Sequence, residues 1–262
     1  MKQIIKAFAK FNLLLNIFPK LSNQSKHQLQ SIMCLDLMHY DEIAIKESSK
    51  FSINYYQNKH LIMIPNDSIT AGLAWLKVHF PALSINYQIT VFKHIPVGAG
   101  LGGESSDCAT VLNYIIQINH LELTEKLKLD LALDVGSDIC FFLSKYSQAY
   151  VYEYGNQVIK LPDFQLNYLL ALPNASTSTK QVFANFDQIP NFQSSFYSYN
   201  DCVQIIKNKS WNLLQNNLLL SAFATNKELK TIYQTLINDY PSFYVCLNGS
   251  GSSFLLVSKS KL

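Results

Sequence analysis

Apolar and polar residues alternate along several stretches of this chain, and the clearest alternation covers residues 83–92. There Ile85, Ile89 and Val91 fall on one side, as in a half-buried β-strand. Residues 105–119 instead carry apolar side chains at helical spacing, which predicts an amphipathic helix. A run rich in glycine lies between them, so the pattern predicts a strand, a glycine-rich loop and a helix in direct succession.

The remaining pattern predicts an α+β protein in two domains, residues 1–150 and residues 151–262. In the N-terminal domain we expect these further elements: one or two strands over residues 4–17, strands at 32–38 and 42–47, and a helix at 67–78. In the C-terminal domain we expect strands at 150–153, 157–161 and 168–172, a loop at 188–199, helices at 181–186, 201–208, 212–222 and 227–238, and a final strand, turn and strand at 243–257.

Composition narrows the class of protein. The 262 residues are 48% hydrophobic and 15% charged, which is typical of a globular chain. The formal net charge of +3 comes without a basic run, so we expect no nucleic-acid partner. No apolar run is long enough to span a bilayer, and Asn12 and Asn16 interrupt the apolar N-terminus, so we expect neither a membrane partner nor a signal peptide.

The five cysteines are scattered, odd in number and without a C-x-x-C pair. This argues against a disulfide framework or a zinc site and favours a reducing cytoplasm. We expect a monomer or a weak homodimer that acts on a small molecule.

The glycine-rich run carries the candidate chemistry. Glycines allow positive φ angles and let a phosphate approach the backbone amides, and the following helix adds the unpaired N–H groups of its first turn. Hydroxyl groups at Ser105 and Ser106 are placed to cap that helix or to bind a phosphate or its magnesium ion. The candidate ATP-binding residues are therefore Pro96, Val97, Gly98, Ala99, Gly100, Leu101, Gly102, Gly103, Glu104, Ser105 and Ser106.

Other interpretations of this run are weaker. A capped turn without a ligand would not need so many glycines. Gly98, Gly100 and Gly103 satisfy the dinucleotide pattern G-x-G-x-x-G, but no acidic residue follows at the end of a second strand. A Walker A loop would require lysine where this chain has Glu104, and a carboxylate there would repel phosphates.

The run from Pro96 to Ser106 resembles the central motif of the GHMP kinases, which are named for galactokinase, homoserine kinase, mevalonate kinase and phosphomevalonate kinase. Three more segments resemble motifs of this family in the same order: Ala-Lys-Phe-Asn-Leu-Leu-Leu at 9–15, Gly-Ser-Asp-Ile-Cys-Phe-Phe at 136–142 and Leu-Asn-Gly-Ser-Gly-Ser-Ser at 247–253. Lys-His-Ile-Pro at 93–96 and Asn-Asp at 200–201 also fit, so the resemblance covers nearly the whole chain.

The resemblance implies an N-terminal ATP-binding domain of the ribosomal-protein-S5-domain-2-like type and a ferredoxin-like C-terminal substrate domain, with the active site in the cleft between them. Within the family, the motifs are most similar to those of enzymes that act in the non-mevalonate route to isoprenoid precursors. Those enzymes transfer the γ-phosphate of ATP, with Mg²⁺, to the 2-hydroxyl of a methylerythritol that carries a cytidine diphosphate group. The motifs leave the magnesium ligands open.

The resemblance also assigns roles to single residues. It makes Asp138 the catalytic base and Lys10 the cation that keeps Asp138 ionised and stabilises charge at the reacting centre. It gives substrate binding to Asn12, His27, Phe183, Gly249, Ser250 and Gly251. Taken alone, each has an ordinary structural explanation, such as a turn aspartate, a surface lysine or a core phenylalanine.

The chain departs from the family pattern at several positions. Lys26 replaces an aromatic residue that would sandwich the cytosine, Glu104 replaces a loop glycine, and Cys140 replaces a proline. A further helix and strand are also expected after Val257. These departures keep two alternatives open beside the main interpretation: another GHMP kinase of homoserine or mevalonate type, and a degenerate nucleotide-binding protein without activity. A dinucleotide oxidoreductase is the least favoured.

Overall fold

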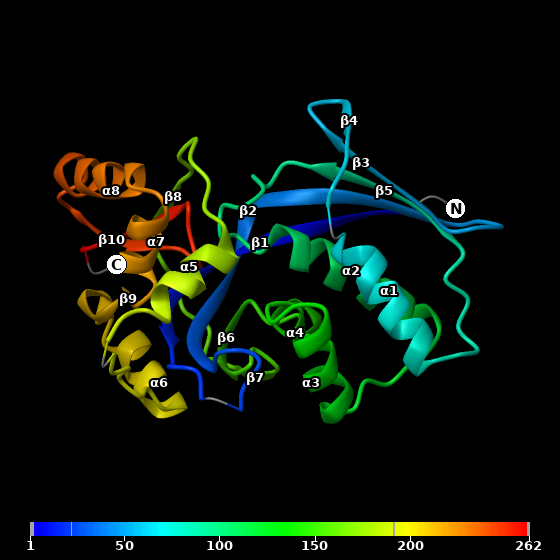
Figure 1. Cartoon of the computed structure of the whole chain (residues 1–262), viewed down its shortest axis with the longest axis horizontal. Coiled ribbons are helices and arrows are strands. Elements are labelled where there is room, and N and C mark those ends of the chain that lie inside the picture. Colours follow the sequence, from blue (N-terminus) through cyan, green and yellow to red (C-terminus); the bar gives the residue numbers. More distant parts are fainter. Residues whose placement is uncertain (1–2, 22, 66, 191, 261–262) are drawn as a thin grey trace.

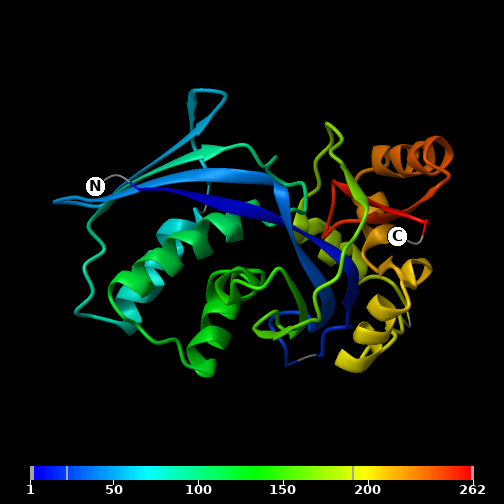
Figure 2. The same ribbon diagram turned by 180° about the vertical axis from the view of Figure 1, so that it is seen from behind.

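The computed structural model describes residues 3–21, 23–65, 67–190 and 192–260 and contains two β-sheets (Figure 1). The larger sheet has eight strands, and the smaller sheet has three. Helices α1 and α2 lie along one face of the larger sheet, and the smaller sheet lies with α5–α8 at the other end of the molecule (Figures 1 and 2). The chain is thus the expected mixture of α and β structure.

Two long antiparallel strands, β1 (Gln3–Ile17) and β2 (Leu29–Glu47), form the centre of the larger sheet. Their register shifts between Phe8 and Ala9, where Ala9 pairs with Asp36 and Phe8 with Tyr40. The two strands predicted at 32–38 and 42–47 are therefore one strand with a bulge. The prediction divided this strand in two because polar residues lie between the segments. A bulge tolerates polar positions that a regular half-buried strand does not.

The other strands attach on both sides of this pair. The sheet order is β4-β3-β5-β2-β1-β9, and β6 pairs with the first half of β2 and with β7. These strands have the following bounds: β3 Ser52–Gln57, β4 His60–Ile62, β5 Tyr87–Lys93, β6 Gln148–Glu153, β7 Gln157–Lys160 and β9 Gln215–Asn216. The alternation predicted over residues 83–92 is confirmed by β5, whose residues alternate between buried and half-buried.

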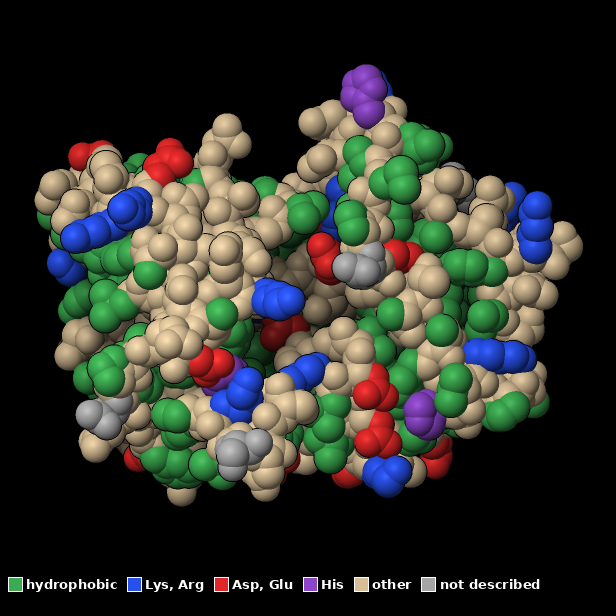
Figure 3. Space-filling view, in the orientation of Figure 1, with side chains coloured by type: hydrophobic (Ala, Val, Ile, Leu, Met, Phe, Trp, Pro, Cys, Tyr) green, Lys and Arg blue, Asp and Glu red, His purple; other side chains and the backbone are tan. Residues whose placement is uncertain are grey.

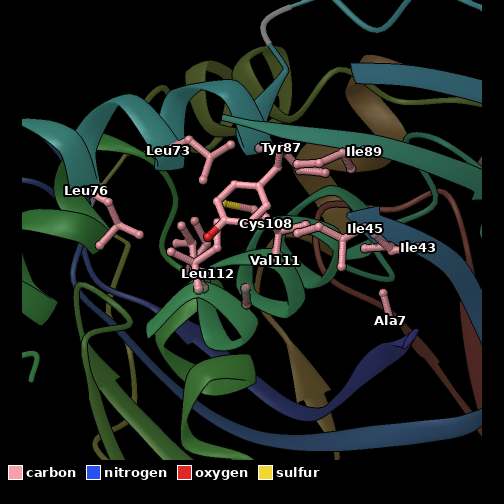
Figure 4. Close-up of a cluster of buried hydrophobic side chains, with 14 of the residues drawn as sticks. Ala7, Ile43, Ile45, Leu73, Leu76, Tyr87, Ile89, Cys108, Val111 and Leu112 are labelled. Atoms are coloured by element: carbon pink, nitrogen blue, oxygen red, sulfur yellow. The ribbon is translucent and has the colours of Figure 1, made fainter. Parts of the chain in front are cut away.

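Four helices belong to this half of the chain: α1 Ser68–His79, α2 Gly103–Ile118, α3 Glu125–Asp134 and α4 Ile139–Ser144. The buried face of α2 supplies Cys108, Val111 and Leu112 to a cluster that also holds Leu73 from α1 and Ile43 from β2 (Figure 4). Its residues are almost fully inaccessible to solvent, so apolar burial fixes α2 against the sheet and sets the direction of its N-terminus.

The smaller sheet has the order β10-β11-β8 and packs against four helices. Its elements are β8 Tyr168–Ala171, β10 Phe243–Leu247 and β11 Phe254–Ser258, with α5 Thr179–Phe186, α6 Tyr199–Lys207, α7 Leu219–Thr225 and α8 Glu228–Asp239. The helix predicted over 212–222 is wrong: a 3₁₀ turn (Trp211–Leu213) and β9 precede α7. The loop predicted at 188–199 is confirmed for 188–190 and 192–198, while residue 191 lies outside the described residues.

The boundary predicted after residue 150 falls inside β6, which belongs to the larger sheet. The chain leaves that sheet after Lys160 and enters the smaller sheet at Tyr168.

All five cysteines are buried and free, in line with the predicted absence of disulfides. Within the described residues, no helix combines the length and the apolar character that a membrane crossing would need.

Candidate functional site

A cavity of about 370 Å³ opens between the two sheets, where the surface is visibly hollowed (Figure 3). The glycine-rich loop forms one wall, and residues from β1, β2, α5, the β10–β11 turn and the segment just before α4 form the others. We call it the central cavity. Most predicted site residues line it: Lys10, Asn12, Pro96, Val97, Gly98, Ala99, Gly100, Leu101, Gly102, Gly103, Glu104, Ser105, Asp138, Phe183, Gly249 and Ser250.

The glycine-rich loop depends on glycine at two positions where backbones approach closely. At Gly100 the φ angle is +75°, and a Cβ would lie 2.3 Å from the carbonyl oxygen of Asn248. Gly102, with φ of +69°, caps α2, and a Cβ there would crowd the Lys10 side chain at 3.1 Å. Any other residue would strain the backbone and push these neighbours away. The first turn of α2 then presents its unpaired N–H groups toward the cavity.

The β10–β11 turn contacts this loop directly through backbone atoms. The N–H of Ser252 donates to the carbonyl of Gly98, and the N–H of Ser253 donates to the carbonyl of Ala99, each over 3.2 Å. The side chain of Asn248, which is fully buried, accepts from the N–H of Asn12 at 2.9 Å. Asn248 therefore joins β1, the loop and the turn into one unit, although the sequence motif pointed only to the three residues that follow it, Gly249, Ser250 and Gly251.

Lys10 and Asp138 meet at the end of the loop. The Nζ atom of Lys10 lies 3.3 Å from Oδ2 of Asp138 and donates to Oδ1 of Asn12 at 2.7 Å. Asn12 in turn donates to Ser31 at 2.7 Å, so its amide orientation is fixed on both sides. The lysine side chain is 4% exposed, so its charge is kept near the cavity rather than in bulk water.

Asp138 comes from a different element, the residue that precedes α4. Its carboxylate makes no capping hydrogen bond to the helix, and its side chain is 27% exposed. Apart from Lys10, no ion-pair partner of Asp138 occurs within the described residues. A carboxylate that is free of the helix cap and held beside a buried ammonium can accept a proton from a group bound in the cavity.

The aromatic side of the cavity is built by α5. Phe183 lines the cavity, and its ring centroid lies 5.0 Å from that of His27. The Nε2 atom of His27 is 2.6 Å from Oδ1 of Asp187, and the ring also meets Phe186 edge-on at 5.7 Å. His27 therefore sits behind Phe183 and is not part of the cavity wall.

Two other predicted residues also lie outside the wall. The hydroxyl of Ser106 donates to the carbonyl of Phe8 at 2.6 Å, so it ties α2 to β1 instead of facing the cavity. Gly251 lies one residue beyond the wall-forming part of the β10–β11 turn, with φ of +90°. The serine motif alone could not separate the two hydroxyls, because that depends on which side of α2 faces the sheet.

The residues that depart from the family pattern have clear structural positions. Nζ of Lys26 donates to the carbonyls of Ala132 and Leu133 at the end of α3, and burial lowers its pKa despite the opposing charge of Asp134. Glu104 is exposed at the mouth of the cavity.

Cys140 is buried against α3, where its Sγ atom lies 3.3 Å from the carbonyl of Lys128. Burial raises the pKa of the Cys140 thiol to about 12, so the group stays protonated and acts as a small packed side chain.

Sequence reasoning missed one charged cluster beneath the loop. Nζ of Lys93 lies 2.5 Å from Oδ2 of Asp41 and 2.6 Å from Oδ2 of Asp107, and all three side chains are almost completely buried. Burial raises the pKa of Asp107 to about 8, although Lys93 opposes that shift. The Lys-His-Ile-Pro segment marked Lys93, but no local pattern indicated its partners.

Comparison with known proteins supports one family. The profile described as GHMP kinases N terminal domain matches residues 69–146. A 4-diphosphocytidyl-2-C-methyl-D-erythritol kinase from Ureaplasma parvum serovar 3 is 34% identical over 260 residues, which covers 97% of this chain and 94% of the relative. A relative of the same name from Campylobacter jejuni strain RM1221 is 30% identical, with 97% of this chain and 100% of the relative covered.

Among solved structures, a crystal structure of 4-(cytidine 5'-diphospho)-2C-methyl-D-erythritol kinase superimposes with a TM-score of 0.71. It is 22% identical, and 99% of this chain and 91% of that chain are covered. At this identity the likeness concerns the fold.

Proposed function

This chain belongs to the 4-diphosphocytidyl-2-C-methyl-D-erythritol kinases, a branch of the GHMP kinases, and we propose that its central cavity is where the family's reaction takes place. The protein is a kinase of isoprenoid precursor synthesis with ATP as co-substrate. The reaction transfers the γ-phosphoryl group of ATP to the 2-hydroxyl of 4-diphosphocytidyl-2-C-methyl-D-erythritol. The observation that carries the proposal is the Lys10–Asp138 pair beside the glycine-rich loop.

The proton step is assigned to Asp138. The attacking group is a tertiary alcohol, which is a weak nucleophile until its proton is removed. The Asp138 carboxylate, free of the α4 cap, accepts that proton as the oxygen attacks the γ-phosphorus. The bond from phosphorus to the bridging oxygen of ADP breaks, and ADP leaves with that electron pair.

Lys10 and Asn12 supply position and charge. The Lys10 ammonium lies between Asp138 and Asn12, so it holds the base in place and faces the negative charge that develops on the transferred group. Asn12 is fixed by Ser31 and Asn248, and in turn it orients Lys10. Because these partners are buried, the arrangement is already formed before the substrate binds.

The glycine-rich loop is proposed to hold the triphosphate of ATP. Positive φ angles at Gly98, Gly100 and Gly102 expose the backbone, and the α2 N-terminus adds N–H groups and the positive end of a helix dipole. In the absence of a cation the Glu104 carboxylate repels phosphate, so the amide groups of the loop and not this side chain are proposed to contact the triphosphate directly. Gly249 and Ser250 close the opposite wall, where backbone amides can bind the substrate diphosphate.

The residues present fit a magnesium ion. Magnesium in kinases is usually bound by one or two carboxylates together with phosphate oxygens. Two carboxylates, those of Glu104 and Asp138, line the same cavity as the phosphate-binding loop. When bound, magnesium would neutralise part of the phosphate charge, and Glu104 is the residue we propose to hold it.

The cytidine group is proposed to bind at Phe183. This ring lines the cavity and is backed by His27, which is held by Asp187. Lys26 occupies the place of a second stacking partner but is engaged with α3. Recognition of the base is therefore proposed to depend on a single stacking face. The cytoplasmic location and the monomeric or weakly dimeric state stay predictions.

The test is a coupled assay of ADP release with purified protein, ATP and magnesium. It compares 4-diphosphocytidyl-2-C-methyl-D-erythritol, mevalonate and homoserine as acceptors. We expect turnover with the cytidyl acceptor only. Asp138→Asn should lower kcat by about a hundred- to ten-thousand-fold, the range for loss of a general base, while ATP still binds.

Turnover with mevalonate or homoserine would reassign the substrate within the GHMP kinases. Binding of ATP without turnover on any acceptor would instead support a degenerate nucleotide-binding protein. A normal rate in Asp138→Asn would show that the base is another residue.

A further inference from the structure

The two ends of the phosphate-binding loop meet at a single buried ammonium group. Lys93 is the last residue of β5, immediately before the segment that leads into the loop, and Asp107 lies near the start of α2, immediately after it. The 2.6 Å contact between Lys93 Nζ and Asp107 Oδ2 therefore closes the loop at its base. The ammonium also lies close beneath the loop itself, because a Cβ at Gly103 would be 3.5 Å from it.

Asp41 holds the Lys93 ammonium group from the other side, at the point where the chain enters the loop. Its Oδ2 atom accepts from Lys93 at 2.5 Å, and its Oδ1 atom accepts from the backbone N–H groups of His94 at 2.5 Å and Ile95 at 2.8 Å. Asp41 belongs to β2, in the centre of the larger sheet. The chain entering the loop is thus held by the sheet through two backbone hydrogen bonds and one ion pair.

The cluster holds one more carboxylate than a simple ion pair needs. Asp41 and Asp107 are 0% and 2% exposed, and Oδ1 of Asp107 has no hydrogen-bond partner within the described residues. Burying a second acid beside an existing Lys–Asp pair is unfavourable for folding by itself. The second acid is therefore better explained by its effect on loop geometry than by a contribution to stability.

We propose that Lys93 and Asp107 are positioning residues for ATP: their contact fixes the span between β5 and α2, so that the loop amides converge on the phosphates. This inference rests on the proposed function of the loop as the triphosphate site. It concerns two residues that are assigned to neither substrate: Lys93 lines the central cavity at the base of the loop, and Asp107 lies outside the cavity wall. Small displacements of positioned groups cost large factors in binding or rate, so a shift of α2 at its start should weaken ATP binding.

The substitution that tests this is Asp107→Ala. It leaves Lys93 paired with Asp41, so no buried charge loses its only partner and the protein should fold. Lys93→Met would leave two buried carboxylates together and is the poorer choice. Asp107→Asn is the conservative variant, because its amide oxygen still accepts a hydrogen bond from Lys93 and the side chain can no longer ionise.

The measurement is direct binding of fluorescent analogues of ATP and of cytidine diphosphate, each displaced by the unlabelled nucleotide. Thermal melting confirms that each variant is folded. We expect Asp107→Ala to raise the Kd for ATP at least about tenfold, equivalent to about 1.4 kcal/mol, while the Kd for cytidine diphosphate stays unchanged. Asp107→Asn should bind ATP like the native protein. Ile206→Ala, a core substitution in α6 away from the loop, is the matched control for general destabilisation.

Unchanged ATP affinity in Asp107→Ala would overturn the proposal, and so would an equal loss of affinity for both ligands. An ATP affinity lowered to the same extent by Ile206→Ala would overturn it as well. The readout does not need turnover. If the protein failed to phosphorylate the cytidyl acceptor, the proposed function would fall, while a selective effect of Asp107→Ala on ATP binding would still support the positioning role.

Discussion

The side chain of Asn248 donates a hydrogen bond to the carbonyl oxygen of Gly100 over 3.2 Å, although 148 positions separate the two residues. Through this contact the β10–β11 turn of the smaller sheet supports the glycine-rich loop, which follows β5 of the larger sheet. The proposed ATP site is therefore not complete without residues from the C-terminal part of the chain. Substitutions in the loop should affect both the ATP affinity and the packing of the two sheets.

Gly100→Ala tests the contact between the loop and the β10–β11 turn. A Cβ would lie 2.3 Å from the Asn248 carbonyl and would also have to adopt φ of +75°. We expect a loss of about 2–6 kcal/mol in the free energy of unfolding, the sum of backbone strain and overpacking, together with loss of ATP binding. Urea denaturation and ATP binding would measure the two effects.

Gly98→Ala is the matched comparison for Gly100→Ala. It has a similar φ of +72°, but the nearest atom to its added Cβ is 3.9 Å away. It should therefore cost only the strain of about 1–3 kcal/mol. Equal destabilisation by the two variants would show that the close approach to Asn248 does not contribute to the loss in the free energy of unfolding.

Phe183→Ala should weaken binding of the cytidyl substrate. Stacking of a base on an aromatic ring contributes about 1–3 kcal/mol, so the KM for that substrate should rise by roughly five- to 150-fold while the KM for ATP is unchanged. Phe183→Tyr keeps the ring and should bind nearly as well as the native protein. A normal KM in Phe183→Ala would place the cytosine elsewhere.

Lys26→Met should lower stability and leave catalysis intact. The Lys26 ammonium donates to two carbonyls at the end of α3, and their loss should cost about 1 kcal/mol in the free energy of unfolding. Lys20→Met is the surface control, since Lys20 is exposed and its ion pair with Asp187 spans 3.8 Å. If Lys26→Met instead raised the KM for the cytidyl substrate without a change in stability, Lys26 would be a diphosphate ligand.

The raised pKa of Asp107 predicts a specific dependence of stability on pH. In the unfolded chain this carboxyl loses its proton near its usual pKa of 3.8, whereas in the folded protein burial keeps the proton bound up to about pH 8. The folded state binds more protons between these values, so the free energy of unfolding falls as the pH rises from about 4 to about 8. Lys93 and Asp41 both lie against the Asp107 carboxyl group. Because the pKa of Lys93 is raised, its ammonium group loses its proton only above this pH range.

Urea denaturation at pH 5 and pH 8 checks this prediction. Asp107→Asn removes the titrating group. The free energy of unfolding of this variant minus that of the native protein should therefore increase from pH 5 to pH 8 by at least about 1.4 kcal/mol, the equivalent of one pKa unit. A constant difference between the two proteins would contradict a raised pKa.

Several elements were predictable because their pattern is local. The alternation around Ile89 predicted β5, and the spacing of Val111 and Ile115 predicted α2, each within a few residues. Helix α3 was missed because Leu127, Leu129 and Leu131 alternate with polar residues as in a strand. The Thr124 cap and residues with good helix propensity outweigh that alternation.

The order of the motifs by itself indicated the family, which the comparisons confirm. It also predicted the phosphate-binding loop and the roles of Lys10 and Asp138, because these predictions depend on residue type and spacing along the chain. Only the tertiary structure decided that Ser106 faces β1, that His27 stands behind Phe183, and that Asp41 and Asp107 share Lys93. The physical reason is that the free energy of a buried charge or hydroxyl is set by its partners. Folding brings those partners together from distant strands and helices, where no local pattern records them.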